Sequence, residues 1–315
     1  MLDRVKAEAT VRAYRTGGTV SSLVPWRIGL GIGQAIGRTA ALTSRERRLI
    51  VERNLNRIYG PDLRGSQRAT KVAQTFDSYA RYYFDSFRLP RMSAEQVARG
   101  IVVEGIEHLE VAMAEDPVGP VLALPHLGGW EWAAAWITRV RGWGLAAVVE
   151  ELHPPELFEW FLEFRRSLGM NIIPLGPDAA ARVAAAALDK EIVCLLCDRD
   201  IGGGGVEVDF LGEPTKLPAG PAVMALRTGC RLLPTAVYFE RGDGVRGLVR
   251  PPIDTTRHGS LREDVTRVTQ ALADELEVLI RRAPEQWHLM QPNWPSDHEA
   301  VARLRRGGVA SSPRS

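Results

Sequence analysis

The spacing of apolar and polar residues divides the chain near residue 100. Before that point, apolar positions recur at steps of three and four, which is the period of an amphipathic helix. The clearest series is Phe76, Tyr79, Tyr83 and Phe87. Pro90 follows this series and ends the predicted helix. Residues 1–98 are therefore predicted to be helical.

Beyond residue 100, short continuous apolar runs alternate with helical segments. Two such runs are GPVLALP at 119–125 and EIVCLLC at 191–197. Strands that are apolar on both faces are typical of a largely parallel sheet covered by helices on both sides. We therefore expect an α/β fold over residues 99–298, with a mostly parallel central sheet, forming one integrated domain with the N-terminal helices. The end of the chain, 299–315, is predicted to be a disordered tail.

The composition argues against several classes of protein. The chain has 315 residues, 45% of them apolar, and a net charge of only +2. Its arginines are scattered rather than clustered, so nothing indicates binding to nucleic acid. Three cysteines give no disulfide framework, and Cys194 and Cys197 lie inside an apolar run, where a structural role is expected. A reduced cytosolic setting fits this pattern.

The segment 21–42, SSLVPWRIGLGIGQAIGRTAAL, is the most apolar part of the N-terminal region. No run in the chain reaches the roughly 18 apolar residues of a membrane-spanning helix, and the N-terminus does not resemble a secretory signal. Arg27 and Arg38 bracket the apolar part, a composition that suits a helix lying in a membrane interface. A core-facing helix is equally compatible with it.

The stretch LPHLGGWEW, 124–132, places a histidine directly after a predicted strand. On one continuous helix, side chains five residues apart diverge by about 140°. His126 and Glu131 would then not face each other. If His126 instead precedes the helix and the glycines allow a sharp turn, the Glu131 carboxylate can fold back and orient the imidazole as a general base. A purely structural pair is the alternative.

Several sequence blocks carry a resemblance to a known family. They are LVPWRIGLGIGQAIGR, RRLIVERNLNRIYG, LALPHLGGWEW, FLEFRRSLGMNIIPLG, CDRDIGGGGVEVDFLGEPTKLPAGPA and PEQWHLMQPNW. In this order, over residues 20–295, they resemble the lipid A lauroyl/myristoyl acyltransferase superfamily, whose glycerolipid acyltransferase-like motif is H-x4-D/E. Within that superfamily, the wording of the block that begins at Cys197 is most similar to the branch that acylates phosphatidylinositol mannosides.

The resemblance implies a reaction. A fatty acyl group, of palmitoyl type, passes from acyl-CoA to a mannose hydroxyl of a phosphatidylinositol mannoside glycolipid. His126 acts as general base, Glu131 is its partner, and neither a metal nor a cofactor is needed. The resemblance also implies a peripheral or monotopic protein on the cytoplasmic face of the inner membrane. A lipid A precursor or another glycolipid or lysolipid as acceptor, and a non-catalytic lipid-binding protein, are the alternatives.

Side chains near the expected carboxyl edge of the sheet are candidates for binding the acceptor. Carboxylates and arginines can hold the hydroxyls of a sugar, or can simply form salt-bridged turns. The candidates are Glu150, Arg165, Asp198, Arg199 and Asp200.

Tryptophans flank the histidine block at positions 130, 132 and 136. Trp130, Trp132 and Trp136 either belong to the core or line an acyl groove. Among the other histidines, only His288 in PEQWH is singled out for a test.

Overall fold

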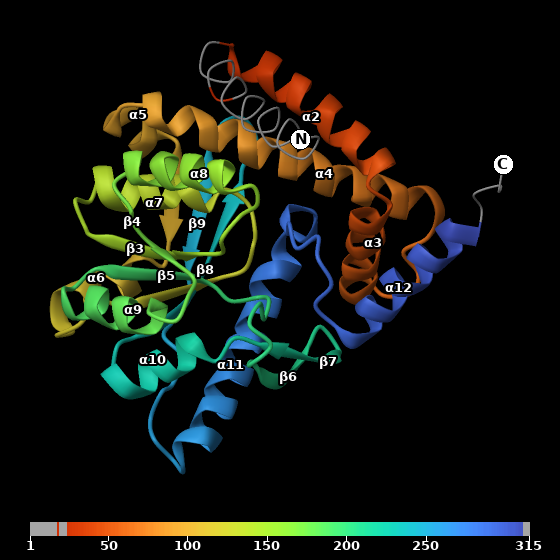
Figure 1. Cartoon of the computed structure of the whole chain (residues 1–315). Coiled ribbons are helices and arrows are strands. Elements are labelled where there is room, and N and C mark those ends of the chain that lie inside the picture. The colour runs from red at the N-terminus through yellow and green to blue at the C-terminus, as the bar shows by residue number, and fades with distance from the viewer. Residues whose placement is uncertain (1–17, 19–23, 311–315) are drawn as a thin grey trace.

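The computed structural model describes residue 18 and residues 24–310 (Figure 1). Its centre is a seven-stranded sheet of order β1-β9-β8-β2-β5-β3-β4. All neighbouring strands run parallel except β8 and β9, so the predicted mostly parallel sheet is confirmed. The strands are β1 Ile101–Glu104, β2 Val121–Leu124, β3 Leu145–Val149, β4 Asn171–Pro174, β5 Ile192–Leu196, β8 Leu232–Phe239 and β9 Val245–Val249.

Both faces of this sheet are covered by helices, which explains why its central strands β2 and β5 are apolar throughout. In β2, Val121 and Ala123 belong to one buried cluster, and Leu122 and Leu124 belong to the other. The cluster on one face includes residues of α5 Ala94–Arg99, α6 Ile106–Glu115, α7 Trp130–Arg139 and α8 Pro155–Ser167. The cluster on the opposite face includes residues of α9 Ala179–Leu188, α10 Gly220–Thr228 and α11 Leu261–Arg282.

The described part of the chain before β1 is helical, as the apolar spacing predicts. It contains α2 Trp26–Thr43, α3 Arg45–Tyr59, α4 Gly65–Arg88 and the short helix η1 Leu89–Arg91, which are followed by α5. Figure 1 shows α2, in red, lying along α4. The two helices approach closely at glycines: a Cβ on Gly29 would lie 2.2 Å from the ring of Phe84, and one on Gly37 would lie 2.8 Å from the carbonyl oxygen of Phe76.

The opposite side of α2 remains apolar and exposed. Ile28, Ile32 and Ile36 are 58%, 52% and 65% exposed. Within the described residues, α2 thus has one face packed on α4 and an opposite face that exposes these isoleucines. Within the described residues, no helix has the length and apolar character needed to cross a membrane.

A two-stranded antiparallel hairpin after β5 differs from the prediction. It consists of β6 Val206–Phe210 and β7 Glu213–Leu217, whereas the sequence pattern predicts only an irregular strand beginning at VEVDFLG. The second strand, EPTKL, buries Thr215 and Leu217 and exposes Lys216. Its proline and polar residues weaken the period-two signal, so packing rather than local propensity forms this strand.

The C-terminal segment is also corrected. The composition predicts a disordered tail at 299–315, but α12 extends over Pro295–Ala310, after the short helix η2 Pro284–Gln286. Residues 311–315 lie outside the described part. The helix is held at its start, where buried Asp297 accepts hydrogen bonds from Arg53 at 2.5 Å and Arg57 at 2.7 Å. Because Arg53 and Arg57 belong to α3, the composition of the C-terminal segment alone does not reveal that this helix is anchored.

Candidate functional site

His126 lies on a sharp turn between β2 and α7. Gly128 has a φ of +60°, and a Cβ there would lie 1.7 Å from the carbonyl oxygen of Val237. Only glycine can occupy such a position. The turn therefore places His126 at the carboxyl edge of the sheet and outside the helix that begins at Trp130.

The imidazole of His126 is paired with Asp198, which follows β5. Because β2 and β5 are parallel neighbours, their carboxyl ends meet, and the Cys197 N–H donates to the Leu124 carbonyl at 2.8 Å. Nδ1 of His126 lies 2.6 Å from Oδ1 of Asp198. The main-chain N–H of His126 donates to Oδ2 of the same carboxylate at 3.0 Å.

Asp198 is completely buried and still suited to be an anion. Burial alone would raise the pKa of its carboxyl, but the charge of His126 and the hydrogen bonds it receives outweigh burial and lower that pKa below its ordinary value. One of these hydrogen bonds comes from Nε1 of Trp287 at 2.7 Å. An ionised Asp198 favours the tautomer of His126 that carries its proton on Nδ1.

This tautomer leaves Nε2 of His126 as the nitrogen that can take a proton from a substrate. The His126 side chain is 33% exposed, whereas that of Asp198 is 0% exposed. A half-exposed imidazole backed by a buried carboxylate is the arrangement of a general base that removes a proton from a hydroxyl group.

Glu131 does not occupy the place beside the imidazole that its spacing suggests. Its buried carboxylate accepts hydrogen bonds from the hydroxyl of Tyr82 at 2.6 Å and from Nη2 of Arg165 at 3.1 Å. Because Glu131 lies in the first turn of α7, its side chain is directed to partners on α4 and α8, and the carboxylate partner of His126 is Asp198 instead. Burial raises the pKa of Glu131, an effect that Arg165 and Tyr82 oppose.

The remaining candidates for acceptor binding fall into two groups. Nη2 of Arg199 lies 2.6 Å from Oε2 of Glu150, so the pair links the ends of β5 and β3. Asp200 accepts a hydrogen bond at 2.8 Å from the main-chain N–H of Gly205, within its own loop. Arg165 lies apart from both, with Glu131 and above the ring of Trp130 at 5.2 Å.

Comparison with known proteins identifies the family. A model of the family described as bacterial lipid A biosynthesis acyltransferase matches residues 4–296. The chain belongs to this family. It is 37% identical over 309 residues to a phosphatidylinositol mannoside acyltransferase of Mycolicibacterium smegmatis, an alignment that covers 95% of this chain and 96% of the relative. A protein of the same name from Mycobacterium tuberculosis (strain CDC 1551 / Oshkosh) is 42% identical over 246 residues, or 76% of this chain and 74% of the relative.

The structure of this acyltransferase also reveals site residues that the sequence pattern does not single out. Tyr82 contacts Glu131, Trp287 contacts Asp198, and the side chain of Asn293 donates to the Asp198 carbonyl at 3.0 Å. Trp287 and Asn293 lie within the PEQWHLMQPNW block, and Tyr82 lies beside the aromatic series of α4. The sequence marks these segments, but only the fold brings Trp287 and Asn293 to Asp198 and Tyr82 to Glu131.

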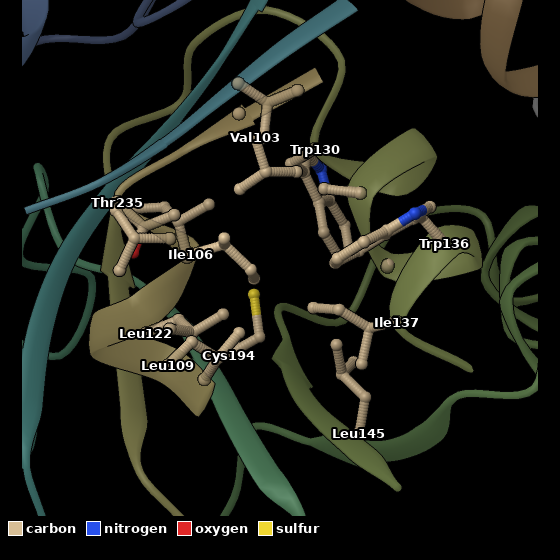
Figure 2. A pocket seen from close by; sticks show the side chains of 16 residues that line it. Val103, Ile106, Leu109, Leu122, Trp130, Trp136, Ile137, Leu145, Cys194 and Thr235 are labelled. Carbon is tan, nitrogen blue, oxygen red and sulfur yellow. The ribbon is translucent and has the colours of Figure 1, made fainter. Parts of the chain in front are cut away.

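An apolar cavity lies between α6, α7 and the sheet (Figure 2). Its volume is about 30 Å³, and Trp130 and Trp136 line it together with Leu122 and Cys194, whose sulfur points into it. Burial raises the pKa of the Cys194 thiol to about 12, so this cysteine is a neutral wall residue, as its apolar run predicts. Trp132 lies elsewhere: its indole donates to the Val97 carbonyl at 3.2 Å.

No group of three or more His, Cys, Asp or Glu side chains is arranged to hold a metal ion within the described ranges.

Proposed function

We propose that this acyltransferase transfers a fatty acyl group, of palmitoyl type, from acyl-CoA to a mannose hydroxyl of a phosphatidylinositol mannoside. The observation that carries the chemistry is the His126–Asp198 pair, with its imidazole half-exposed and its carboxylate buried. The choice of acceptor rests on the names of relatives that share 37–42% of their residues with this chain.

The reaction follows from the orientation of the imidazole. Nε2 of His126 removes the proton of the acceptor hydroxyl while the hydroxyl oxygen attacks the thioester carbonyl carbon. The tetrahedral oxyanion then collapses, the carbon–sulfur bond breaks, and the CoA thiolate leaves and takes up the proton. Asp198 stabilises the imidazolium that forms in between. The N-terminal end of α7, next to His126, supplies a favourable potential for the oxyanion.

The roles of the other residues follow from their contacts. We assign to Asp198 the role that the H-x4-E spacing suggests for Glu131. Glu131 and Arg165 then support the start of α7, directly after the catalytic turn. Glu150, Arg199 and Asp200 lie near the carboxyl edge of neighbouring strands. There the two carboxylates can accept hydrogen bonds from the hydroxyls of a sugar, and Arg199 can donate to them.

We place the acyl chain in the cavity beside Trp130 and Trp136, because this cavity has an apolar lining. A space of about 30 Å³ is about that of one water molecule, so side chains of α6 and α7 must move apart to admit a chain. The apolar lining gives the chain an environment in which each buried methylene contributes about 0.8 kcal/mol.

We propose that the exposed face of α2 lies against a lipid bilayer. Ile28, Ile32 and Ile36 recur every four residues and present one apolar stripe. A peripheral or monotopic position on the cytoplasmic face of the inner membrane would bring the site to a glycolipid acceptor and leave acyl-CoA accessible from the cytosol.

The deciding experiment is a transfer assay with the purified full-length chain, palmitoyl-CoA and a phosphatidylinositol mannoside in vesicles. The product ester is detected by mass spectrometry, and His126→Ala is compared with wild type. We expect product from wild type and a loss of about 10²–10⁴-fold in the variant. His258→Ala, which removes an exposed histidine, is the matched control.

Three outcomes would overturn the proposal or a part of it. Near-wild-type activity of His126→Ala would refute the general-base mechanism. Faster transfer to a lipid A precursor or to another glycolipid in the same assay would refute the acceptor and retain the chemistry. Binding of lipid without any product would indicate a non-catalytic protein.

A further inference from the structure

The segment 286–288 is attached to the turn that carries His126. The main-chain N–H of His288 donates to the carbonyl of His126 at 2.7 Å, and the N–H of Gly128 donates to the carbonyl of Gln286 at 3.0 Å. Leu127 and Trp287 form the antiparallel bridge between them. The catalytic turn therefore has an added strand-like partner 160 residues further along the chain, as the positions 127 and 287 show.

The side chain of Gln286 holds this segment in place. Its Oε1 accepts from the N–H of Phe239 at 2.6 Å, and its Nε2 donates to the carbonyl of Phe239 at 3.0 Å. The amide thus pairs with the end of β8 as a main-chain peptide group would. Hydrogen bonds thus join the segment 286–288 to β8 on one side and to the catalytic turn on the other, and they fix its position between the two.

Trp287 extends from this segment to the buried carboxylate. It is 3% exposed, and its Nε1 lies 2.7 Å from Oδ2 of Asp198. This is the carboxylate oxygen that does not face the imidazole ring. Asp198 therefore receives the ring N–H of His126 on Oδ1 and two further donors, the main-chain N–H of His126 and the indole N–H, on Oδ2. With both oxygens engaged, the plane of the carboxylate cannot turn without losing a hydrogen bond.

We propose that Trp287 is a positioning residue for the general base. Its indole N–H holds the Asp198 carboxylate in the plane that keeps the proton of His126 on Nδ1, while the main chain of the same segment holds the turn. The proposal rests on the proposed function, since it needs His126 to act as a base. The alternative is a Trp287 that only fills the core, where its ring lies edge-on to Phe210 and Trp294.

The test removes the donor without changing the shape. Trp287 is replaced by 3-benzothienylalanine, in which sulfur takes the place of the indole N–H, and Trp287→Phe serves as a second variant. Trp294 receives the same replacement as the matched control. It is fully buried, it touches Trp287, and its indole N–H donates to the carbonyl of Phe210 at 3.2 Å rather than to Asp198.

We expect the replacement at 287 to lower kcat about tenfold, the order contributed by one hydrogen bond to a charged group, with KM for acyl-CoA unchanged. The replacement at 294 is expected to leave both constants near wild type. Equal kcat losses at 287 and 294, or no loss at 287, would overturn the positioning role.

A second measurement separates this inference from the function itself. The proton between His126 and Asp198 is observed as a downfield resonance in the NMR spectrum of the full-length protein and is assigned by its absence in His126→Ala. We expect this resonance to shift or broaden in the 287 variant and to stay in place in the 294 variant. If wild type transfers no acyl group and the resonance still responds to position 287, the function fails and the positioning role stands. If transfer depends on His126 but the resonance does not change in the 287 variant, the proposed function stands and the positioning role fails.

Discussion

Oδ1 of Asp198 lies 2.6 Å from Nδ1 of His126, although the two residues are 72 positions apart in the chain. Asp198→Asn keeps the size of the side chain and removes its charge, so the imidazolium loses its stabilising partner and the tautomer is no longer selected. We expect kcat to fall by about 10²–10⁴-fold. The measurement is steady-state acyl transfer from palmitoyl-CoA. Asp274→Asn, on the exposed face of α11, is the control for loss of one carboxylate, and a comparable loss there would contradict the assignment.

Glu131 and Arg165 form a buried ion pair, with side chains 1% and 13% exposed. Removing one partner leaves the other charged and buried, so Glu131→Gln and Arg165→Met should each lower the free energy of unfolding by about 3 kcal/mol. The double variant should lose less than the sum of the two. Urea denaturation of the four proteins in this cycle measures the coupling. Strict additivity would show that the pair contributes nothing, and a kcat loss without any loss of stability would return Glu131 to a catalytic role.

His288 gives the protein a stability that depends on pH. Burial, and secondarily the charge of His126, lower the pKa of His288 to about 3. An unfolded histidine takes up its proton near pH 6.5, so between about pH 6.5 and 3 the unfolded state binds more protons than the folded state. The free energy of unfolding therefore falls as pH drops through this window, by at most about 1.4 kcal/mol per pH unit.

The pH prediction is checked by urea denaturation between about pH 7 and pH 5. His288→Gln should flatten the slope, because glutamine takes up no proton. His258→Gln, which changes a histidine that is 60% exposed, should retain the wild-type slope. An unchanged slope in His288→Gln would show that other groups cause the dependence.

The close packing of α2 on α4 depends on Gly37. A Cβ added at Gly37 would lie 2.8 Å from the Phe76 carbonyl oxygen and 3.1 Å from the Ala80 side chain. Gly37→Val should therefore push the helices apart and lower the free energy of unfolding by about 1–3 kcal/mol. Gly31→Ala is the matched control on the same helix, because a Cβ there has no neighbour within 4 Å. It should instead stabilise by about 0.5–1 kcal/mol. Thermal unfolding distinguishes the two, and similar melting temperatures would contradict the packing argument.

If the apolar cavity between α6 and α7 holds the acyl chain, filling it should change the preference for chain length. Ala133 lines the cavity from α7, so Ala133→Phe should fill it and favour acyl-CoA donors shorter than palmitoyl-CoA. Competition between donors of different length, read out by product mass, measures the preference. Ala185→Phe, on the exposed side of α9, should leave it unchanged. If Ala133→Phe keeps the wild-type ratio of products, the acyl chain lies elsewhere.

The order of strands and helices follows from the sequence alone, because apolar periodicity is a local property. The runs around Leu122 and Cys194 are apolar at every position, which is typical of a strand buried on both faces. The same reasoning places His126 after a strand and before a helix, with Gly128 at a turn that only glycine can make. The polar strand β7 and the anchored helix α12 escape this reasoning, because partners elsewhere in the fold stabilise them.

The pairing of side chains at the site was decided by the tertiary structure. Spacing favours Glu131 as the partner of His126 because the two are close in sequence, but the parallel pairing of β2 with β5 brings Asp198 to the imidazole instead. Glu131 is directed to Arg165 by the rotation of α7, and Trp287 reaches Asp198 from a segment near the end of the chain. A sequence specifies which residues follow each strand, whereas strand order and helix packing determine which of those residues meet.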